Sequence, residues 1–322
     1  MKDIFLERTS AAWNVSASEA ERLLNTRYAT TIRINPLKVR KSTLSNLKKQ
    51  YANVEKLEWI NDAYFFVDPQ PKPSLLPEFA NGEIIIQNPA SFIPILELQP
   101  QANQTILDMC AAPGAKSSHI AALTNNKATL ILNDTSRTRF FKMKKLMHSM
   151  DVTAEYSLRD GRNLSKEYGN NAFDAILLDA PCSGEANIKL DAMQSWSLAT
   201  IKRLSSLQSR LLQEAFTLLK PGGRLVYSTC TIAPEENELV IDTLLRHNPP
   251  ASIIQPKTYP TRALNGIIRW NDKDLSSDIK KCIRLLPTET TKPFFIAVIT
   301  KDANMHGDDD DSYERLVRSF SK

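Results

Sequence analysis

The chain has 322 residues, of which 42% are hydrophobic, and its formal net charge is +5. This composition supports a packed core and excludes a chain that is disordered throughout. The chain has no run of about 18 apolar residues that could span a membrane, and its first residues do not read as a secretory signal. The four cysteines match neither a zinc pattern nor a disulfide framework. We therefore expect a cytoplasmic protein with reduced thiols, no metal site and no membrane association.

Residues 1–75 are predicted to form a small α+β module that ends in a linker. The first 25 residues have helical character, and Ser16 precedes Glu19 by three positions, the spacing of a helix cap. Alternating side chains predict a strand over residues 30–35. The other elements expected here are a helix over residues 42–51, a strand over 64–67 and an irregular proline-rich linker over 69–77.

Residues 76–300 alternate strands with helices, which predicts a doubly wound α/β domain of Rossmann type. A helix stop and turn are expected at Lys220-Pro-Gly-Gly223, and Pro234 followed by Glu235 and Glu236 suits the first turn of a helix. Residues 301–322 are expected to form a flexible acidic tail. The expected strands are 105–109, 129–133, 153–156, 175–179, 224–228 and 294–300, and the expected helices are 115–123, 136–150, 198–219 and 234–246.

Basic residues gather in two places. Between residues 27 and 56 there are eight lysines and arginines against one acid, Glu55, and a second cluster occupies residues 137–145. Basic patches attract phosphate backbones and release counterions, which favours a nucleic-acid partner. A solvated surface without a partner is the alternative.

A strand-to-helix crossing after Asp108 predicts a cofactor loop. The turn contains Pro113 and Gly114, and the crossing presents backbone N–H groups and a helix N-terminus to a ligand. It lacks both G-x-G-x-x-G and the phosphate-loop pattern, so a pyrophosphate cofactor is not favoured. Asp134 follows the next strand, where a carboxylate can accept both ribose hydroxyls, and Asp160 follows the third, where one can meet an adenine edge. Three acids at consecutive strand ends favour a nucleoside site.

Two cysteines follow predicted buried strands, which suggests covalent catalysis. Cys182 lies in a Pro-Cys-Ser-Gly turn, and Cys230 lies between two threonines. A thiolate is a strong nucleophile, whereas most free cysteines are small buried hydrophobes. Because parallel strands present their carboxyl ends at one edge of a sheet, two thiols placed there favour the catalytic interpretation. Cys110 is expected to pack within the loop, and Cys282 to be structural.

Four motifs carry a resemblance to a known family. They are DMCAAPGAK (108–116), NDTS (133–136), DAPCSG (179–184) and YSTCT (227–231). Together they resemble the Nol/Nop/Sun, or Fmu-like, RNA cytosine-C5 methyltransferases over about residues 84–300. The N-terminal stretch 31–38 resembles the family's small RNA-binding extension. The loop departs from the family pattern, because Ala115 stands where the family usually has glycine; a position that only starts a helix tolerates alanine.

The resemblance implies a Rossmann-like class I methyltransferase that uses S-adenosylmethionine to make 5-methylcytosine in RNA. It implies that Cys230 is the nucleophile and that Cys182 assists product release. Asp179 would hydrogen-bond cytosine N3 as a protonated carboxyl, and Lys116 would orient the base. The cofactor would contact Cys110, Ala111, Ala112, Pro113, Gly114, Ala115, Lys116, Asp134, Arg139, Asp160 and Asp179.

Ribosomal RNA is the preferred substrate, with transfer RNA as the alternative, and a monomer is the default. Two other hypotheses stay open at this point. One is a methyltransferase that uses the same cofactor on a different substrate. The other is a non-catalytic RNA-binding assembly factor on the same fold. The two thiols and the intact motifs favour the enzyme.

Overall fold

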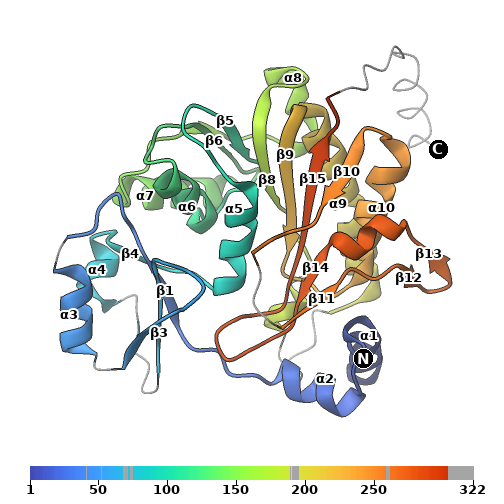
Figure 1. The fold of residues 1–322 in the computed structure, drawn as a ribbon, viewed down its shortest axis with the longest axis horizontal. Helices are drawn as coiled ribbons and strands as arrows, with labels where there is room; N and C mark the ends of the chain where they lie inside the picture. The colour runs from blue at the N-terminus through green and yellow to red at the C-terminus, as the bar shows by residue number, and fades with distance from the viewer. Residues whose placement is uncertain are drawn as a thin grey trace.

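The computed structural model describes residues 1–40, 42–51, 53–67, 72, 75–188, 190, 196–258 and 262–303. A nine-stranded sheet with helices on both faces dominates the molecule (Figure 1). Its strand order is β11-β14-β15-β9-β8-β5-β6-β7, and β10 also pairs with β15. The strands are β5 (Thr105–Asp108), β6 (Thr129–Asn133), β7 (Glu155–Ser157), β8 (Phe173–Asp179), β9 (Leu219–Thr229), β10 (Ala251–Ile254), β11 (Ala263–Asn265), β14 (Ile283–Leu285) and β15 (Phe294–Lys301).

Strands β5 to β9 run parallel, and β15 is antiparallel to β9. The pairs Ile106↔Ala175 and Leu178↔Tyr227 set the register of the central strands. Helices cover both faces of this sheet, so its central strands are apolar nearly throughout. Their carboxyl ends therefore converge at one edge, where the predicted motifs lie.

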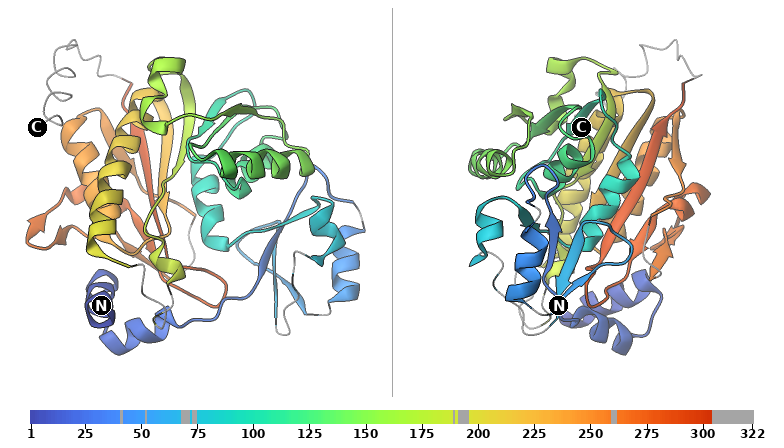
Figure 2. Two further views of the ribbon diagram at one scale, coloured as in Figure 1. Left: turned by 180° about the vertical axis from the view of Figure 1, so that it is seen from behind. Right: turned by 60° about the vertical axis from the view of Figure 1, so that its left-hand side comes forward.

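The two faces of the sheet have separate cores (Figure 2). One face packs against α5 (Ile93–Leu98), α6 (Ala115–Leu123) and α7 (Arg137–Ser149). The other packs against α9 (Leu198–Leu218) and α10 (Glu238–His247). Side chains alternate between these cores along each strand: Ile106 faces the first, and Leu107 faces the second. The remaining short elements are α8 (Ser165–Tyr168), β12 (Arg269–Trp270), β13 (Lys273–Asp274), η2 (Pro89–Phe92), η3 (Gly161–Asn163), η4 (Glu185–Asn187), η6 (Pro234–Glu236) and η7 (Ser277–Lys281).

The N-terminal part contains two structures. Helices α1 (Lys2–Trp13) and α2 (Ala17–Leu24) pack against the large body, where Phe5 and Trp13 share a core with Trp196 and Trp270. A four-stranded antiparallel sheet in the order β2-β3-β1-β4 follows. Its elements are β1 (Thr31–Ile34), α3 (Thr43–Gln50), β2 (Val54–Lys56), β3 (Ala63–Phe66), α4 (Pro77–Ala80) and β4 (Ile84–Ile86). Because β4 pairs with β1, this sheet includes residues beyond position 75.

Most predicted elements are confirmed within one or two residues, including the Ser16 cap, whose side chain accepts from the Glu19 N–H. The helix predicted over 234–246 is wrong at its start: a 3₁₀ turn ends at Glu236, Asn237 departs from helical dihedrals, and α10 begins at Glu238. The turn predicted at 220–223 instead lies inside β9, next to a register shift in its pairing with β8.

Other expectations fare differently. Arg33, assigned to a basic surface, is 1% exposed and donates to Gln87 and Ser118. Most of the linker predicted over 69–77 and the acidic residues 308–311 of the predicted tail lie outside the described residues.

In the described ranges, no helix combines the length and apolarity needed to cross a bilayer. The same ranges contain no cluster of three or more His, Cys, Asp or Glu arranged to hold a metal ion.

Candidate active site

The carboxyl ends of four strands bring the predicted residues to one edge of the sheet. β5 ends at Asp108, β6 at Asn133, β8 at Asp179 and β9 at Thr229. The short turns that follow these strands carry the cofactor loop and both thiols. Residues far apart in the chain therefore meet because the strands are parallel neighbours.

The two predicted thiols are in contact. The Sγ atoms of Cys182 and Cys230 lie 3.4 Å apart, and both side chains are partly buried. The hydrogen bond from Cys182 lowers the pKa of Cys230, with a further lowering from the positive charge of Lys116, although burial and Asp179 oppose the shift. The pKa of Cys182 is raised well above its usual value, first by the hydrogen bond to Cys230 and then by burial. Cys230 is therefore the better thiolate.

Lys116 and Asp179 form a partly buried ion pair beside the thiols. Lys116 Nζ lies 2.7 Å from Asp179 Oδ2, and the Ser228 hydroxyl donates to Asp179 Oδ1 at 2.8 Å. Lys116 Nζ also lies 5.4 Å from the centroid of the Phe294 ring. Both oxygens of the carboxylate therefore accept hydrogen bonds, and the ammonium group lies close enough to Cys230 to lower the pKa of its thiol.

The cofactor loop depends on one backbone conformation. Gly114 has φ of +109°, in the region that glycine tolerates best, and a Cβ there would lie 2.6 Å from Met147 Cε. Ala115 begins α6 with ordinary helical geometry. The interpretation that Ala115 merely starts the helix is therefore correct, and Gly114 is the residue that needs the special conformation.

Asp134 and Arg139 close the loop from the side of β6. Asp134 is 3% exposed and accepts from the backbone N–H groups of Ala112 and Ser136. Arg139 lies 3.3 Å from the Asp134 carboxylate and donates to the Ala112 carbonyl. Asp134 and Arg139 thus fix the loop backbone as well as carrying opposite charges at its rim.

Asp160 lies at the start of η3, where it caps the turn and pairs with Arg162. That pairing lowers its pKa. Asp108 is buried; it accepts from Ser117 at 2.7 Å through Oδ2, while Oδ1 has no partner within the described part of the chain. Burial raises the pKa of Asp108 to about 7. The site thus offers acidic acceptors at three strand ends and backbone N–H groups in the loop. Together these groups fit a cofactor that has a nucleoside and an amino-acid portion.

The remaining cysteines are outside the thiol pair. Cys110 packs against the core between the sheet and α9, and burial raises its pKa, with Asp108 and Asp134 adding to the rise. Cys282 is fully buried in the same core. Both placements agree with the predicted packing roles.

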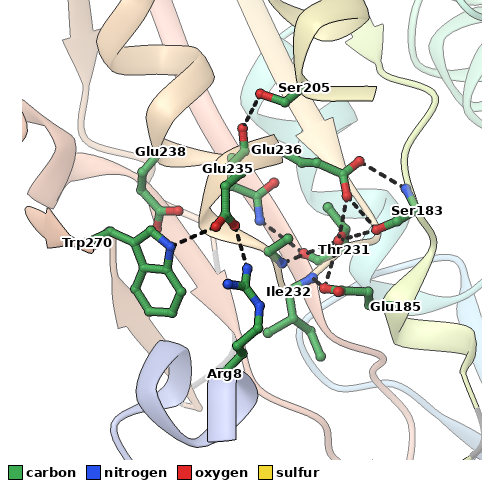
Figure 3. Close-up of polar contacts among 12 residues, drawn as sticks. Arg8, Ser183, Glu185, Ser205, Thr231, Ile232, Glu235, Glu236, Glu238 and Trp270 are labelled. Carbon is green, nitrogen blue, oxygen red and sulfur yellow. Dashed lines mark hydrogen bonds and ion pairs between the residues drawn. The ribbon is translucent and has the colours of Figure 1, made fainter. Parts of the chain in front are cut away.

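Sequence reasoning missed a polar cluster that includes Ser183 and Thr231, the residues that follow the two cysteines (Figure 3). Glu236 accepts hydrogen bonds from Ser183, which follows Cys182, and from Thr231, which follows Cys230. Glu185 accepts from Thr231, from the Ile232 N–H and from Trp196. The signal was the run of acids after Cys230, which was assigned only to a helix start.

Asn187 and Lys292 were also missed. Asn187 Nδ2 lies 4.0 Å from Cys230 Sγ, and Lys292 Nζ donates to Asn187 Oδ1 at 2.7 Å. Neither residue belongs to a motif, and Lys292 lies just before β15, far from Cys230 in the chain. Nothing in the sequence indicated this proximity.

The sheet order and the strand-end site define a Rossmann-like class I methyltransferase. A family described as 16S rRNA methyltransferase RsmB/F matches residues 95–300. A tRNA (cytosine(49)-C(5))-methyltransferase from Pyrococcus abyssi is 34% identical over 276 residues, which cover 84% of this chain and 88% of that protein. A 28S rRNA (cytosine-C(5))-methyltransferase from Mus musculus is 33% identical over 287 residues, covering 85% of this chain and 35% of that protein.

The solved structure of a methyltransferase homologue from Pyrococcus horikoshii superimposes with a TM-score of 0.80 at 29% identity, and covers 92% of this chain and 94% of that one. The chain thus spans most of the Pyrococcus abyssi relative, but only about a third of the length of the mouse relative. It belongs to the RsmB/F family of RNA cytosine-C5 methyltransferases, enzymes that use S-adenosylmethionine. The predicted family, fold class and cofactor are confirmed.

Proposed function

We propose that this protein methylates C5 of a cytosine in RNA through a covalent adduct with Cys230. The observation that carries the proposal is the contact between Cys182 and Cys230 beside the Lys116–Asp179 pair. A contact between two thiols at neighbouring strand ends, one with a lowered pKa and one with a raised pKa, suits one nucleophile and one proton-transfer group.

The chemistry explains why a nucleophile is needed. C5 of cytosine is a weak nucleophile. Addition of the Cys230 thiolate to C6 breaks the C5–C6 double bond, N3 takes up a proton, and the C4–C5 enamine that remains is nucleophilic at C5. When bound, S-adenosylmethionine supplies an electrophilic methyl group. Asp179 would stabilise the adduct by hydrogen-bonding N3 as a protonated carboxyl, which requires that it give up its ion pair with Lys116 when the base binds. Lys116 would then be free to orient the base. Each of these groups lies at the carboxyl edge next to Cys230.

Cys182 would act after the methyl group has been transferred. After methylation the C5 proton must leave before the bond between Cys230 and C6 can break. A water beside Cys182 takes that proton, or Cys182 takes it after its own S–H proton has been released to solvent. The hydrogen bond to Cys230 is the largest cause of the raised pKa of Cys182. Once the Cys230 sulfur is bonded to C6 it carries no thiolate charge, so the charged form of Cys182 becomes easier to reach.

The positions of the residues around the loop suggest which part of the cofactor each would contact. The loop 110–116 would hold the amino-acid portion through backbone N–H groups, Asp134 with Arg139 would lie at the ribose, and Asp160 at the adenine. Asp179, at the end of β8, would lie between cofactor and base. The target base has to leave its stack to reach Cys230, which favours loops or bulges in the RNA.

Ribosomal RNA is the leading substrate, because the family profile and the mouse relative both carry ribosomal RNA names. Transfer RNA is the second candidate. It is favoured by the Pyrococcus abyssi relative, which matches this chain over most of its own length. We assign RNA binding to the N-terminal module predicted over residues 1–75 together with β4, which belongs to the same sheet, catalysis to the rest of 76–300 and a tail to 301–322. A cytoplasmic monomer is part of the proposal.

The proposal is tested by bisulfite sequencing of total RNA from cells with and without the gene. One cytosine that loses protection in ribosomal RNA supports both the reaction and the substrate. A loss confined to transfer RNA keeps the reaction and overturns the preferred substrate. No change in any RNA, with the protein present in the control cells, contradicts the proposed reaction.

A further inference from the structure

The segment from η6 to the start of α10 carries three glutamates with different partners (Figure 3). Glu235 binds Arg8 of α1 and the Trp270 indole. Glu238 pairs with the buried Arg284. Glu236 instead contacts Ser183 and Thr231, the residues that follow the two cysteines, and is fully buried. Its position therefore calls for a separate explanation.

The Glu236 carboxylate bridges the two segments that carry the thiols. Its Oε2 atom accepts from the Ser183 N–H at 2.9 Å and from Gln208 Nε2 at 2.8 Å. Its Oε1 atom accepts from the Ser183 hydroxyl, and the Thr231 hydroxyl shares its one proton between Glu185 at 2.9 Å and Glu236 Oε1 at 3.3 Å. Ser183 directly follows Cys182, and Thr231 directly follows Cys230. One side chain thus fixes both turns.

Glu236 makes no ion pair within the described ranges, so its charge is balanced by hydrogen bonds alone. Burial raises its pKa, and the bonds from Ser183 and Gln208 oppose that rise. The charge acts unequally on the two thiols. It adds to the rise in the pKa of Cys182, after the larger effects of Cys230 and burial. For Cys230 the charged neighbours that matter are Asp179 and Lys116.

We propose that Glu236 is a positioning residue: its carboxylate holds the Cys182 turn against the Cys230 turn, and its negative charge helps to keep the proton on Cys182. Cys182 then donates its S–H to Cys230, and Cys230 becomes the nucleophile. The inference rests on the proposed function for its catalytic meaning. The distribution of the proton itself can be measured without RNA.

The test uses initial rates of alkylation by iodoacetamide at each cysteine at fixed pH, about pH 8, followed by peptide mass spectrometry. In Glu236→Gln we expect a roughly tenfold gain in the thiolate fraction of Cys182 and therefore in its alkylation rate. Glu235→Gln is the matched control, because Glu235 bonds Arg8 and Trp270, and we expect it to leave the rate at Cys182 unchanged. Cys282 should stay unmodified, which reports that the variant is folded.

A folded Glu236→Gln protein with the same alkylation rates as Glu235→Gln overturns the proposal. If Glu236→Gln does not fold, Ser183→Ala decides, since it removes one hydrogen bond and leaves the charge. An alkylation rate at Cys182 equal to or below that of the wild type supports the role of the charge, and a higher rate contradicts it. In methylation assays Glu236→Gln should lower kcat without changing the KM for RNA. If Glu236→Gln changes alkylation as expected but the wild type methylates no RNA, the proposed function is contradicted and the inference about Glu236 is not.

Discussion

Cys182 and Cys230 lie 48 residues apart in the chain, yet their sulfur atoms approach to 3.4 Å. The contact follows from the pairing of β8 with β9, which aligns Asp179 with Ser228 and brings the two turns together. The turns are then joined by hydrogen bonds from Ser183 and Thr231 to Glu236. The sheet register therefore sets the geometry of the thiol pair.

Single replacements of the two cysteines should give different products. Cys230→Ala removes the nucleophile, and we expect methylation to fall below detection while RNA binding is retained. Cys182→Ala keeps the nucleophile but slows proton removal from C5, so a covalent protein–RNA adduct should accumulate. Incubation with RNA and S-adenosylmethionine followed by a denaturing gel measures the adduct.

The double variant Cys182→Ala/Cys230→Ala is the control, and it should form no adduct. If Cys182→Ala methylates RNA at the wild-type rate and forms no adduct, the assignment of separate roles to the two thiols is wrong.

The same proximity predicts sensitivity to oxidation. Diamide can take two electrons and two protons from the thiols to leave a disulfide, which needs the sulfurs to approach to about 2.05 Å. The lowered pKa of Cys230 favours attack by its thiolate. We expect diamide to abolish methylation and dithiothreitol to restore it, with a Cys182–Cys230 peptide visible by mass spectrometry.

Cys110 and Cys282 provide the internal comparison, because burial raises the pKa of both thiols. Loss of activity through modification of either of these cysteines, with no Cys182–Cys230 link, argues against a redox-sensitive pair.

The strand ends of the large sheet could be predicted because each is an apolar run that stops at polar residues. β6 and α6 were predicted at their observed bounds, and both thiols were placed on the correct edge. The hydrogen bonds that bring the turns together could not be predicted, because they join Ser183, Gln208 and Glu236 from three separate elements. Arg33 is a second example: its alternating neighbours predicted the strand, but its buried hydrogen-bond partners, Gln87 and Ser118, come from elsewhere in the fold.

Asp108 should make stability depend on pH in an unusual direction. Its folded pKa of about 7 lies above the unfolded value near 3.9, so its favourable contribution is complete below about pH 4 and is lost as the pH rises through 7. Asp108→Asn removes the buried charge. We expect it to raise Tm at pH 8 by about 2–4 °C, equivalent to about 1 kcal/mol, and to change Tm little at pH 4.

Asp160→Asn is the opposite case, because the hydrogen bond from Arg162 lowers the pKa of Asp160. That contribution is present above the unfolded pKa and is lost as the pH falls, so Asp160→Asn should lower Tm at pH 8 rather than raise it. Equal effects of the two substitutions at pH 8 would contradict the burial of an uncompensated Asp108.

Gly114 and Ala115 should respond differently to exchange of their side chains. Gly114→Ala places a Cβ 2.6 Å from Met147 Cε at a φ of +109°, so we expect a loss of about 1–2 kcal/mol in the free energy of unfolding, and weaker cofactor binding as the loop shifts. Ala115→Gly costs only helix propensity, about 1 kcal/mol, and should leave cofactor affinity within about twofold. Calorimetric titration with S-adenosylmethionine and urea unfolding measure the two effects. The double variant Gly114→Ala/Met147→Ala separates the two causes of the lost cofactor affinity. Partial recovery of the affinity assigns the loss to the clash with Met147, whereas an unchanged affinity assigns it to the backbone conformation alone.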